Sequence, residues 1–396
     1  MNRSLFYLQA PVGNHSYFGK SDRQTAGLSA IEGWSALWFR SGTMSLAAAV
    51  AVTLEPFGDE QTKVLVPGYG CPDLVSALRF CGAEPVFCDL LPDSTRLDPA
   101  LVDQHLKTDR AIKAIIGVDL FGIAEDWKSL RTIADRHQVA LIQDFAQSVQ
   151  TEDVLKESLV GDAAILSFGR GKPVCCLGGG ALLLPSNADA ARINGQWGGL
   201  GTSGTRRIGS MRVKRAVYNF SLRPLVYAQL ARILGDRIGC TRYIPLQSVF
   251  RLPDAEAQYI ERAVEQHWSH HQDKTARLLD LIEHQIPGDG LPSFRFPKNL
   301  HADIQARALL RLPILVAHSD SRQHLIRGLR FNGISATTMY SRPLTTIVNE
   351  YDGHSRYRAL PNAEGFAKQL VTLPVHSRLT ESDMRRMAQT VAEYCS

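Results

Sequence analysis

The chain has 396 residues, of which 44% are hydrophobic and 21% charged, a composition typical of a soluble globular protein. At this length roughly two or three domains with a large core are expected, so disulfide bonds are not needed to stabilise the fold. The net charge of +5 is too small to indicate nucleic acid as a partner, and the seven cysteines show no spacing typical of a metal site.

The N-terminal residues lack the apolar stretch of a signal peptide. The longest apolar run, near Met44–Leu54, is too short to cross a bilayer. We therefore expect a cytoplasmic protein whose cysteines are reduced thiols.

Short apolar segments alternate with helical patterns from residue 43 to residue 184. This alternation predicts a mainly parallel sheet with helices on both faces. The expected strands are Lys63–Val66, Pro85–Cys88, Ile112–Val118, Val139–Gln143, Ala163–Phe168 and Gly180–Leu184. The expected helices are Met44–Leu54, Pro72–Phe80, Pro99–Lys107 and Asp126–His137.

The second half of the chain follows a different pattern. Residues 254–284 contain few helix-breaking residues and predict one long helix. Thr380 and Asp383 have the spacing of a capping box at the start of the last helix. We expect a large domain over residues 1–250, with a basic insert at about 200–250, and a small domain over 251–396. The other expected elements are helices at Ala188–Trp197, Ser321–Phe331 and Thr380–Tyr394 and strands at Leu309–Val316 and Leu370–Leu373.

Two segments place small or acidic residues where a ligand can bind. Gly42 and Thr43 follow Ser41 directly before an Ala-rich helix, and free N–H groups at a helix N-terminus can hold a phosphate. The alternative is simple N-capping by Ser41 or Thr43, which is common. Asp144 ends an apolar strand, where ligands sit in α/β sheets, although an aspartate there can equally cap the next helix. Gln147 follows one turn later.

Lys172 lies in a tight glycine-rich loop that follows Ser167, the last polar residue of an apolar strand. Desolvation in such a loop can lower the pKa of a lysine amine and favour the neutral nucleophile. The loop is not a Walker A motif, because Leu166 and Pro173 stand where that motif requires Gly and Ser or Thr. The Ser167 hydroxyl can bind a phosphate. Taken alone, a solvated lysine and a turn serine are the more common interpretations.

The order of these segments changes that interpretation. The chain reads Ser-Gly-Thr, then strand-Asp-x-x-Gln, then Gly-Asp-x(4)-Ser-Phe-x(3)-Lys, then a Gly triplet. This combination resembles the sugar aminotransferase family called DegT/DnrJ/EryC1/StrS, over roughly residues 36–198 and 255–394. Further matching segments are Val66-Pro67, Gly82–Phe87, Leu120–Gly122, Asn332–Ile334, Leu373–His376 and Leu379-Thr380.

The resemblance implies an α/β fold of the pyridoxal-phosphate-dependent transferase type I. Such a fold has a mainly parallel seven-stranded sheet in the large domain and a small α+β C-terminal domain. The resemblance also implies pyridoxal 5'-phosphate as the cofactor, no metal, and a homodimer.

The same resemblance assigns roles to the residues described above. Lys172 would carry the cofactor as a Schiff base and later move the substrate proton. Asp144 would pair with the pyridinium nitrogen, which makes the ring an electron sink, and Gln147 would face the ring's oxygen. The phosphate would be held by Gly42, Thr43 and Ser167.

Three positions depart from the family pattern. Cys71 stands where many members have an aromatic residue that stacks on the cofactor ring, and the nearby Tyr69 can be aimed elsewhere by its extended segment. Asp119 stands where a histidine is frequent. The segment that reaches into a neighbouring subunit is replaced by the basic insert, in which Asn219 is a candidate counterpart.

The basic insert has no acidic residue between Asp189 and Asp236. Residues 206–234 mix arginines with large apolar side chains, for which we weigh three interpretations. The favoured one is an amphipathic helix that packs on a partner subunit. The second is a surface for the phosphates of an activated sugar, and the third is contact with a membrane surface.

The resemblance implies transfer of an amino group from an amino acid, glutamate or glutamine, to a keto sugar. The sugar would be nucleotide-linked and destined for a polysaccharide, glycolipid or secondary metabolite. A sugar dehydratase of the same family is disfavoured because it would have histidine in place of Lys172. A lyase or desulfurase is also disfavoured, because Cys175 and Cys176 are expected to be packing residues. A catalytically idle, cofactor-binding regulatory module stays open as an alternative, and turnover would distinguish it.

Overall fold

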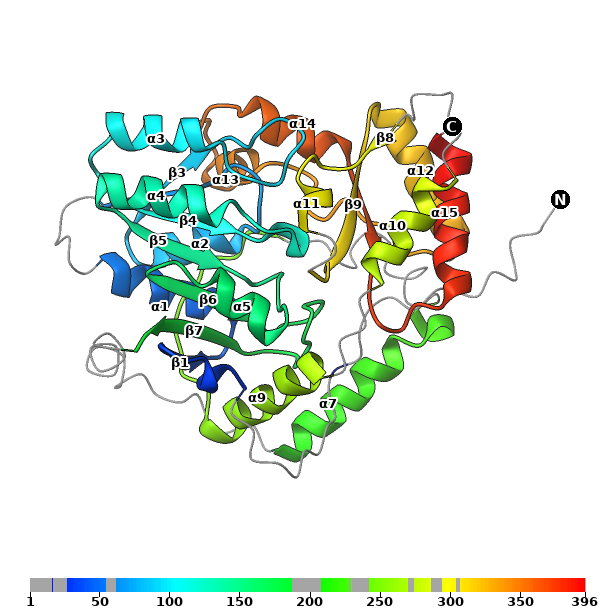
Figure 1. The fold of residues 1–396 in the computed structure, drawn as a ribbon, viewed down its shortest axis with the longest axis horizontal. Coiled ribbons are helices and arrows are strands. Elements are labelled where there is room, and N and C mark those ends of the chain that lie inside the picture. Colours follow the sequence, from blue (N-terminus) through cyan, green and yellow to red (C-terminus); the bar gives the residue numbers. More distant parts are fainter. Residues whose placement is uncertain are drawn as a thin grey trace.

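The computed structural model describes residues 16, 27–54, 62–186, 208–227, 229, 242–269, 274–285, 294–303 and 307–395 (Figure 1). Its central sheet consists of β1 (Trp34–Phe39), β2 (Lys63–Pro67), β3 (Glu84–Cys88), β4 (Ile112–Val118), β5 (Ala140–Asp144), β6 (Ala163–Ser167) and β7 (Gly180–Pro185). The strand order is β1-β7-β6-β5-β4-β2-β3. Only β7 runs antiparallel to its neighbours. The predicted mainly parallel, seven-stranded sheet is confirmed.

Helices cover both faces of this sheet (Figure 1). One face packs against α1 (Gly42–Leu54), α2 (Asp73–Phe80), α13 (Leu344–Asp352) and α14 (Pro361–Gln369). The other face packs against α3 (Pro99–Thr108), α4 (Trp127–His137), α5 (Glu152–Ser158) and α9 (Asp254–Ser269). Each face therefore has its own apolar core.

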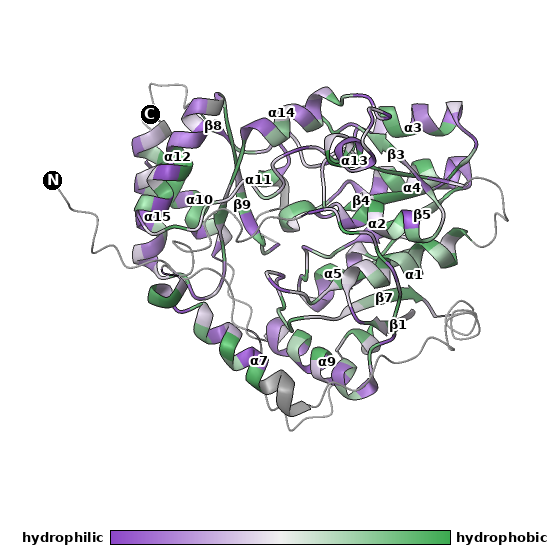
Figure 2. Ribbon diagram, turned by 180° about the vertical axis from the view of Figure 1, so that it is seen from behind, coloured by the Kyte–Doolittle hydropathy of each residue, from purple (hydrophilic) through white to green (hydrophobic). Residues whose placement is uncertain are grey.

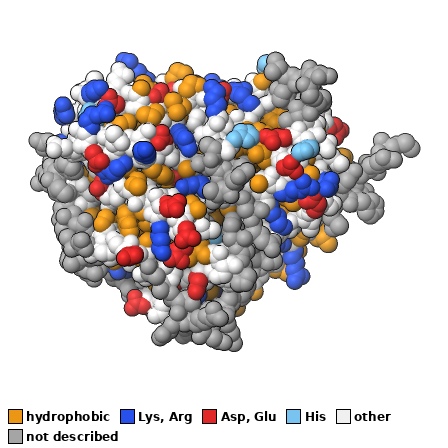
Figure 3. All heavy atoms as spheres, viewed as in Figure 1, with side chains coloured by type: hydrophobic (Ala, Val, Ile, Leu, Met, Phe, Trp, Pro, Cys, Tyr) orange, Lys and Arg blue, Asp and Glu red, His pale blue; other side chains and the backbone are white. Residues whose placement is uncertain are grey.

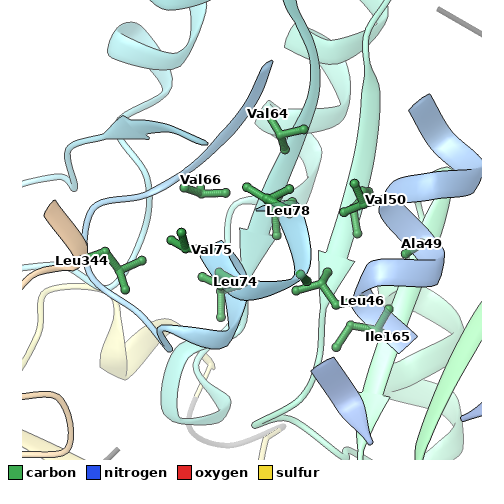
Figure 4. Close-up of a cluster of buried hydrophobic side chains, with 14 of the residues drawn as sticks. Leu46, Ala49, Val50, Val64, Val66, Leu74, Val75, Leu78, Ile165 and Leu344 are labelled. Carbon is green, nitrogen blue, oxygen red and sulfur yellow. The ribbon is translucent and has the colours of Figure 1, made fainter. Parts of the chain in front are cut away.

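The core on the α1 face packs α1 closely against the central sheet. Alanines on α1, such as Ala49, are fully buried, and their small side chains let the helix lie close to β6 and β7. Figure 4 shows Val50 and Leu46 of α1 turned towards Leu78 of α2. Complete burial of one such leucine stabilises the fold by roughly 1.5–3 kcal/mol. Leu344, from α13, belongs to the same cluster.

A second, antiparallel sheet consists of β8 (Phe294–Arg295), β9 (Arg311–Val316) and β10 (Leu370–Pro374), in the order β10-β9-β8. It shares an apolar cluster with α10 (Thr275–Glu283), α12 (Ser319–Phe331) and α15 (Glu381–Cys395). Figure 2 shows hydrophobic and hydrophilic residues on both α12 and α15, as expected for helices with one buried face.

The capping box at the start of α15 is confirmed. The Thr380 hydroxyl accepts a hydrogen bond from the Asp383 N–H (3.1 Å), and the Thr380 N–H donates to the Asp383 carboxylate (3.0 Å). Two of the N–H groups that a helix N-terminus leaves without intrahelical partners are thereby satisfied.

The single long helix predicted over residues 254–284 is wrong. α9 ends at Ser269 and packs on the central sheet, whereas α10 begins at Thr275 and packs on the second sheet. The apolar faces of the two helices serve different cores, so one straight helix cannot bury both. α9 belongs to the predicted small domain by its position in the chain, yet it packs on the central sheet. The domain boundary between residues 250 and 251 stays a prediction. The helix predicted at Ala188–Trp197 lies outside the described residues.

Two further elements lie near the site described below: α7 (Ile208–Ser221), which lies beside α9, and the short 3-10 helix η3 (Leu120–Gly122) (Figure 1). Among the described helices, none is long and apolar enough to span a membrane. On the face shown in Figure 3, acidic and basic side chains are interspersed with apolar ones.

Candidate active site

The predicted site residues meet at the carboxyl edge of the central sheet. β5 ends at Asp144 and its neighbour β6 ends at Ser167, with Asp144 paired to Ile165 in the ladder. α1 starts at Gly42, directly against Ser167. Parallel strands bring their carboxyl ends to one edge, so residues more than 120 positions apart in the chain become neighbours.

Gly42 and Ser167 are in close contact at the N-terminus of α1. A Cβ atom at Gly42 would lie 2.6 Å from the Ser167 Cβ and 2.7 Å from its hydroxyl oxygen, so only glycine fits there. The Ser41 hydroxyl accepts from the Met44 N–H (3.2 Å) and caps the helix. The Ser167 hydroxyl therefore lies at the positive end of a 13-residue helix, an arrangement that suits a phosphate.

The Thr43 side chain has a partner that the sequence did not indicate. Its hydroxyl donates to the Asp73 carboxylate over 2.8 Å. Since that proton is engaged, the Thr43 hydroxyl has no second proton to offer a phosphate. In the predicted cradle, the donors that suit a phosphate are the backbone of Thr43 and the hydroxyl of Ser167. Asp73 also brings a carboxylate close to Asp144, whose pKa it raises.

Asp144 is a buried carboxylate with few hydrogen bonds. The residue is only 6% exposed, and among the described residues its carboxylate accepts one hydrogen bond, from the Ala146 N–H (2.8 Å). Burial raises the pKa of Asp144 to about 6, opposed by the Ala146 N–H and by the charge of Lys172. A carboxylate this poor in donors suits a protonated pyridine nitrogen, which would supply both a hydrogen bond and a positive charge.

Gln147 is fixed at both ends of its amide. Its oxygen accepts from the Phe121 N–H in η3 (3.0 Å), and its Nε2 donates to the Tyr340 hydroxyl (3.2 Å). Tyr340 lies between α12 and α13, so it links the C-terminal part of the chain to the carboxyl edge of the sheet. The contact holds Gln147 in place, and Tyr340 itself is near enough to Asp144 for that carboxylate to help raise its pKa.

Lys172 lies in a compact turn after β6. The Cys176 and Gly178 N–H groups both donate to the Phe168 carbonyl (2.9 and 3.2 Å), which closes the loop around the lysine. Gly171 adopts a left-handed conformation (φ 70°) that favours glycine. Lys172 is near enough to Asp144 and to Cys71 for its charge to lower the pKa of both. The structure thus brings the lysine and the aspartate together, while their roles toward a cofactor stay predictions.

Cys71 and Tyr69 point to different places. Burial raises the pKa of the Cys71 thiol to about 12, so this thiol is neutral beside Lys172 and Tyr340. Tyr69 is buried, donates to the Tyr340 carbonyl (2.9 Å) and packs edge-on against Phe366 at 5.1 Å between ring centroids. Tyr69 therefore lies in the core, and its ring is not available to stack on a ligand.

Asp119 directly follows the neighbouring strand, β4, and is fully buried. It forms an ion pair with Arg307 (2.8 Å) and accepts from the Trp127 indole N–H and the Glu125 N–H, both at 3.0 Å. Asp119, which stands where many family members have a histidine, thus uses its carboxylate in contacts within the protein.

α7, from the basic insert, packs behind the lysine loop. The Tyr218 hydroxyl contacts the Cys175 thiol and the backbone of Gly171. Cys175 and Cys176 are both buried, as expected of packing residues. The Asn219 amide pairs with the backbone of Ser16, accepting over 2.7 Å and donating over 3.1 Å. In the part of the chain that the structure describes, the hydrogen bonds of the Asn219 side chain go to Ser16 and not to the residues around Lys172.

Asp73 and Tyr340 were missed by the sequence analysis. Asp73 lies 30 positions from its partner Thr43, and Tyr340 lies 193 positions from Gln147. In the sequence, Asp73 falls at the start of a predicted helix and gives no sign of a contact with the site. Tyr340 has no neighbouring motif in the sequence. The described part of the chain contains no cluster of His, Cys, Asp and Glu side chains that could hold a metal ion.

Three relatives show what this chain resembles. Over 330 residues it is 26% identical to the UDP-2-acetamido-2-deoxy-3-oxo-D-glucuronate aminotransferase of Pseudomonas aeruginosa, covering 83% of this chain and 77% of that enzyme. It is 40% identical to the erythromycin biosynthesis sensory transduction protein EryC1 of Saccharopolyspora erythraea, over 82% of this chain and 75% of that protein. The crystal structure of NtdA from Bacillus subtilis, with bound cofactor PMP, superposes with a TM-score of 0.67 at 17% identity. The superposition covers 93% of this chain and 75% of NtdA.

The family described as the DegT/DnrJ/EryC1/StrS aminotransferase family matches residues 33–226 and 266–392. This match confirms the resemblance inferred from the motifs, and the relative at 40% identity supports it over most of the chain. The fold agrees with the solved relatives. The chain therefore belongs to the DegT/DnrJ/EryC1/StrS aminotransferase family, and it is an enzyme of the pyridoxal-phosphate-dependent aminotransferase class.

Proposed function

We propose that this protein moves an amino group from glutamate or glutamine to the keto group of a nucleotide-linked sugar, with pyridoxal phosphate held on Lys172. The observation that carries the proposal is the meeting of Lys172 with the donor-poor Asp144, beside the Ser167–Gly42 contact at the N-terminus of α1. The product would serve polysaccharide, glycolipid or secondary-metabolite biosynthesis.

The bound cofactor supplies an electron-accepting ring that stabilises negative charge on the substrate carbon. Asp144 would keep a proton on the ring nitrogen, since a partner with a positive charge favours the ionised form of a buried carboxylate. Ser167 and the backbone at Gly42 and Thr43 would bind the phosphate. Gln147, fixed by Phe121 and Tyr340, would face the ring's oxygen.

Lys172 would act twice. It would first hold the cofactor covalently, and its amine, once released by the incoming substrate, would move a proton to and from the substrate carbon at Nζ. The compact loop closed on the Phe168 carbonyl fixes the backbone from which this side chain extends. The proximity of Asp144 is consistent with a single reaction centre.

The substrate class is supported by the relatives. The Pseudomonas aeruginosa relative is named for a UDP-linked 3-oxo sugar acid, and its match extends over most of both chains. The proposed homodimer agrees with the expectation from the family, and sedimentation of the purified protein would test it. We propose that the protein acts in the cytoplasm.

Absorbance spectra of the purified protein, before and after addition of glutamate or glutamine, test the function directly. We expect a visible band from the bound cofactor in the wild type, and its loss on addition of the amino donor. Lys172→Ala should lack the band of the covalently held cofactor. Asp144→Asn is the companion variant, because it keeps Lys172 but removes the negative charge of the Asp144 carboxylate.

A band that ignores every amino donor would contradict the transaminase proposal and favour an idle cofactor-binding protein. If Lys172→Ala kept the wild-type spectrum, the lysine assignment would be wrong. If the amino donor does remove the visible band, candidate keto sugars can be added to the enzyme that has taken up the amino group. The sugar that restores the visible band is the acceptor.

A further inference from the structure

A cavity of about 560 Å³ lies between α7 and the loop that carries Lys172. Its polar lining consists of Arg170, Lys214, Arg215, Tyr218 and Ser221, and the rest of the lining is apolar. The described residues that line it include three cationic and two hydroxyl-bearing side chains and no carboxylate. Lys214 and Arg215 of the basic insert and Arg170 of the lysine loop therefore face one partly open cavity.

Arg215 is the unusual member of this set. The residue is only 6% exposed, and its guanidinium stacks 3.5 Å from the centre of the Tyr259 ring. Its Nε is buried without a hydrogen-bond partner, and no ion pair joins Arg215 to a carboxylate in the described part of the chain. A buried cation without an anion is costly, so the site is suited to an anionic ligand.

A neighbouring arginine provides the contrast. Arg40 and Arg215 both line an adjoining cavity of about 240 Å³, but Arg40 contacts both oxygens of Glu256, at 3.1 and 3.0 Å. Glu256 is thus already engaged by Arg40. The positive charge that stays available between the two cavities is that of Arg215.

The cavity adjoins the predicted reaction centre. Arg170 lies two residues before Lys172 in the same loop. Tyr218, on the opposite wall, contacts the Gly171 backbone and the Cys175 thiol. A ligand bound between these walls would touch the loop that positions Lys172.

We propose that this cavity binds the diphosphate of the activated sugar, an assignment that rests on the proposed function. The planar guanidinium of Arg215 can contact two phosphate oxygens at once, while Lys214 and Arg170 add charge at the solvent side. Three cations and two hydroxyl groups match the several charges and oxygens of a diphosphate better than the single charge of a carboxylate. The site gives the basic insert a function in substrate binding.

Calorimetric titration of the cofactor-loaded enzyme with inorganic pyrophosphate tests the site. We expect binding by the wild type and a loss of affinity of about tenfold or more in Arg215→Gln, because one charged partner is removed. Lys214→Gln, at an exposed position, should weaken binding by less. Arg223→Gln is the matched control, since Arg223 lies just beyond α7, is exposed and stacks on Phe220 outside the cavity lining.

Two further probes separate the sources of a diphosphate. Tighter binding of UDP than of pyrophosphate would indicate a nucleotide-linked sugar, whereas tighter binding of farnesyl diphosphate would indicate a lipid-linked one. Equal affinities of the wild type, Arg215→Gln and Arg223→Gln for pyrophosphate, or no binding of any probe, would overturn the proposal. The cofactor spectrum of each variant shows whether it is folded and loaded.

The response to glutamate keeps this test separate from that of the proposed function. If pyrophosphate binding depends on Arg215 but no donor alters the spectrum, the anion site stands and the aminotransferase proposal fails. If donors alter the spectrum but binding does not depend on Arg215, the cavity assignment fails alone.

Discussion

Two aspartates at neighbouring strand ends have opposite surroundings. Asp119 follows β4 and Asp144 ends β5, and the Asp119 N–H donates to the Asp144 carbonyl (3.1 Å). Both residues are buried, at 0% and 6% exposure. Asp119 is paired with Arg307 and accepts from Trp127 and Glu125. Among the described residues, the Asp144 carboxylate accepts from one donor, the Ala146 N–H.

The difference separates a carboxylate engaged in structural contacts from one that is left able to bind a ligand. The oxygens of Asp119 are engaged by protein donors, so this residue fixes the arrangement of the chain and has nothing left for a ligand. Asp144 keeps acceptor capacity inside a buried site, which costs stability unless a ligand satisfies it. Burial alone does not identify a site residue, whereas burial together with a shortage of donors does.

The largest expected effect is that of Asp144→Asn on turnover. Under the proposed function Asp144 holds a proton on the ring nitrogen, so removing its charge should lower kcat by roughly 10³-fold, the scale of losing one preorganised electrostatic partner. Steady-state assays with an amino donor and a keto acceptor would measure the change. Asp119→Asn is the control, since it should leave kcat of the folded enzyme within about tenfold. Equal losses in both variants would contradict the distinction.

The second prediction concerns stability. Arg307→Met should lower the free energy of unfolding by about 3 kcal/mol, because the charge of Asp119 is left buried without its partner. The double variant Asp119→Asn/Arg307→Met should recover much of that loss. Urea unfolding of Asp119→Asn, Arg307→Met and the double variant measures these free energies. A double variant no more stable than Arg307→Met would argue against the ion pair.

The third prediction is a pH dependence in the cofactor-free protein. The pKa of Asp144 is raised from 3.8 to about 6 by burial, so the folded state binds this proton more tightly than the unfolded state. The associated stability is fully present below pH 3.8 and is lost as the pH rises through about 6. Relative to Asp144→Asn, the wild type should lose up to about 3 kcal/mol over that range. Parallel curves for the two proteins would refute the shift.

The smallest expected effect is that of Tyr340→Phe. The variant leaves the Gln147 amide without its acceptor, which should cost about 1 kcal/mol of stability and lower kcat several-fold. Unfolding and turnover measured together would show whether the contact positions Gln147. Tyr357→Phe is a suitable control, because the Tyr357 hydroxyl has no hydrogen-bond partner among the described residues. No difference between the two variants would remove Tyr340 from the site.

The central sheet was predictable because its strands are continuous apolar runs separated by helices. β1 (Trp34–Phe39) was missed, since its antiparallel partner β7 follows more than 140 positions later and no turn joins the two. α13 and α14 were missed as well. They are partly polar helices whose buried residues, such as Leu344 and Phe366, become recognisable only against the sheet.

In the candidate site, local motifs located Gly42, Asp144, Ser167 and Lys172, which the fold then brings together. What the motifs could not show is how each polar group is satisfied. The Thr43 bond to Asp73 and the pairing of Asp119 with Arg307, 188 positions away, depend on distant segments. Sequence spacing therefore predicts which residues meet, and the hydrogen-bond partners decide which of them are free to bind.

The packing of Leu344 and Phe366 against α1 and β2 has a consequence for synthesis of the chain. The part of this face that α13 and α14 cover stays open until the ribosome has made α14, more than 300 residues after β1, although α1 and α2 are made early. Contacts this far apart in sequence make folding slow and leave apolar surface exposed meanwhile. A nascent chain stopped before residue 340 should therefore bind chaperones rather than fold as an independent large domain.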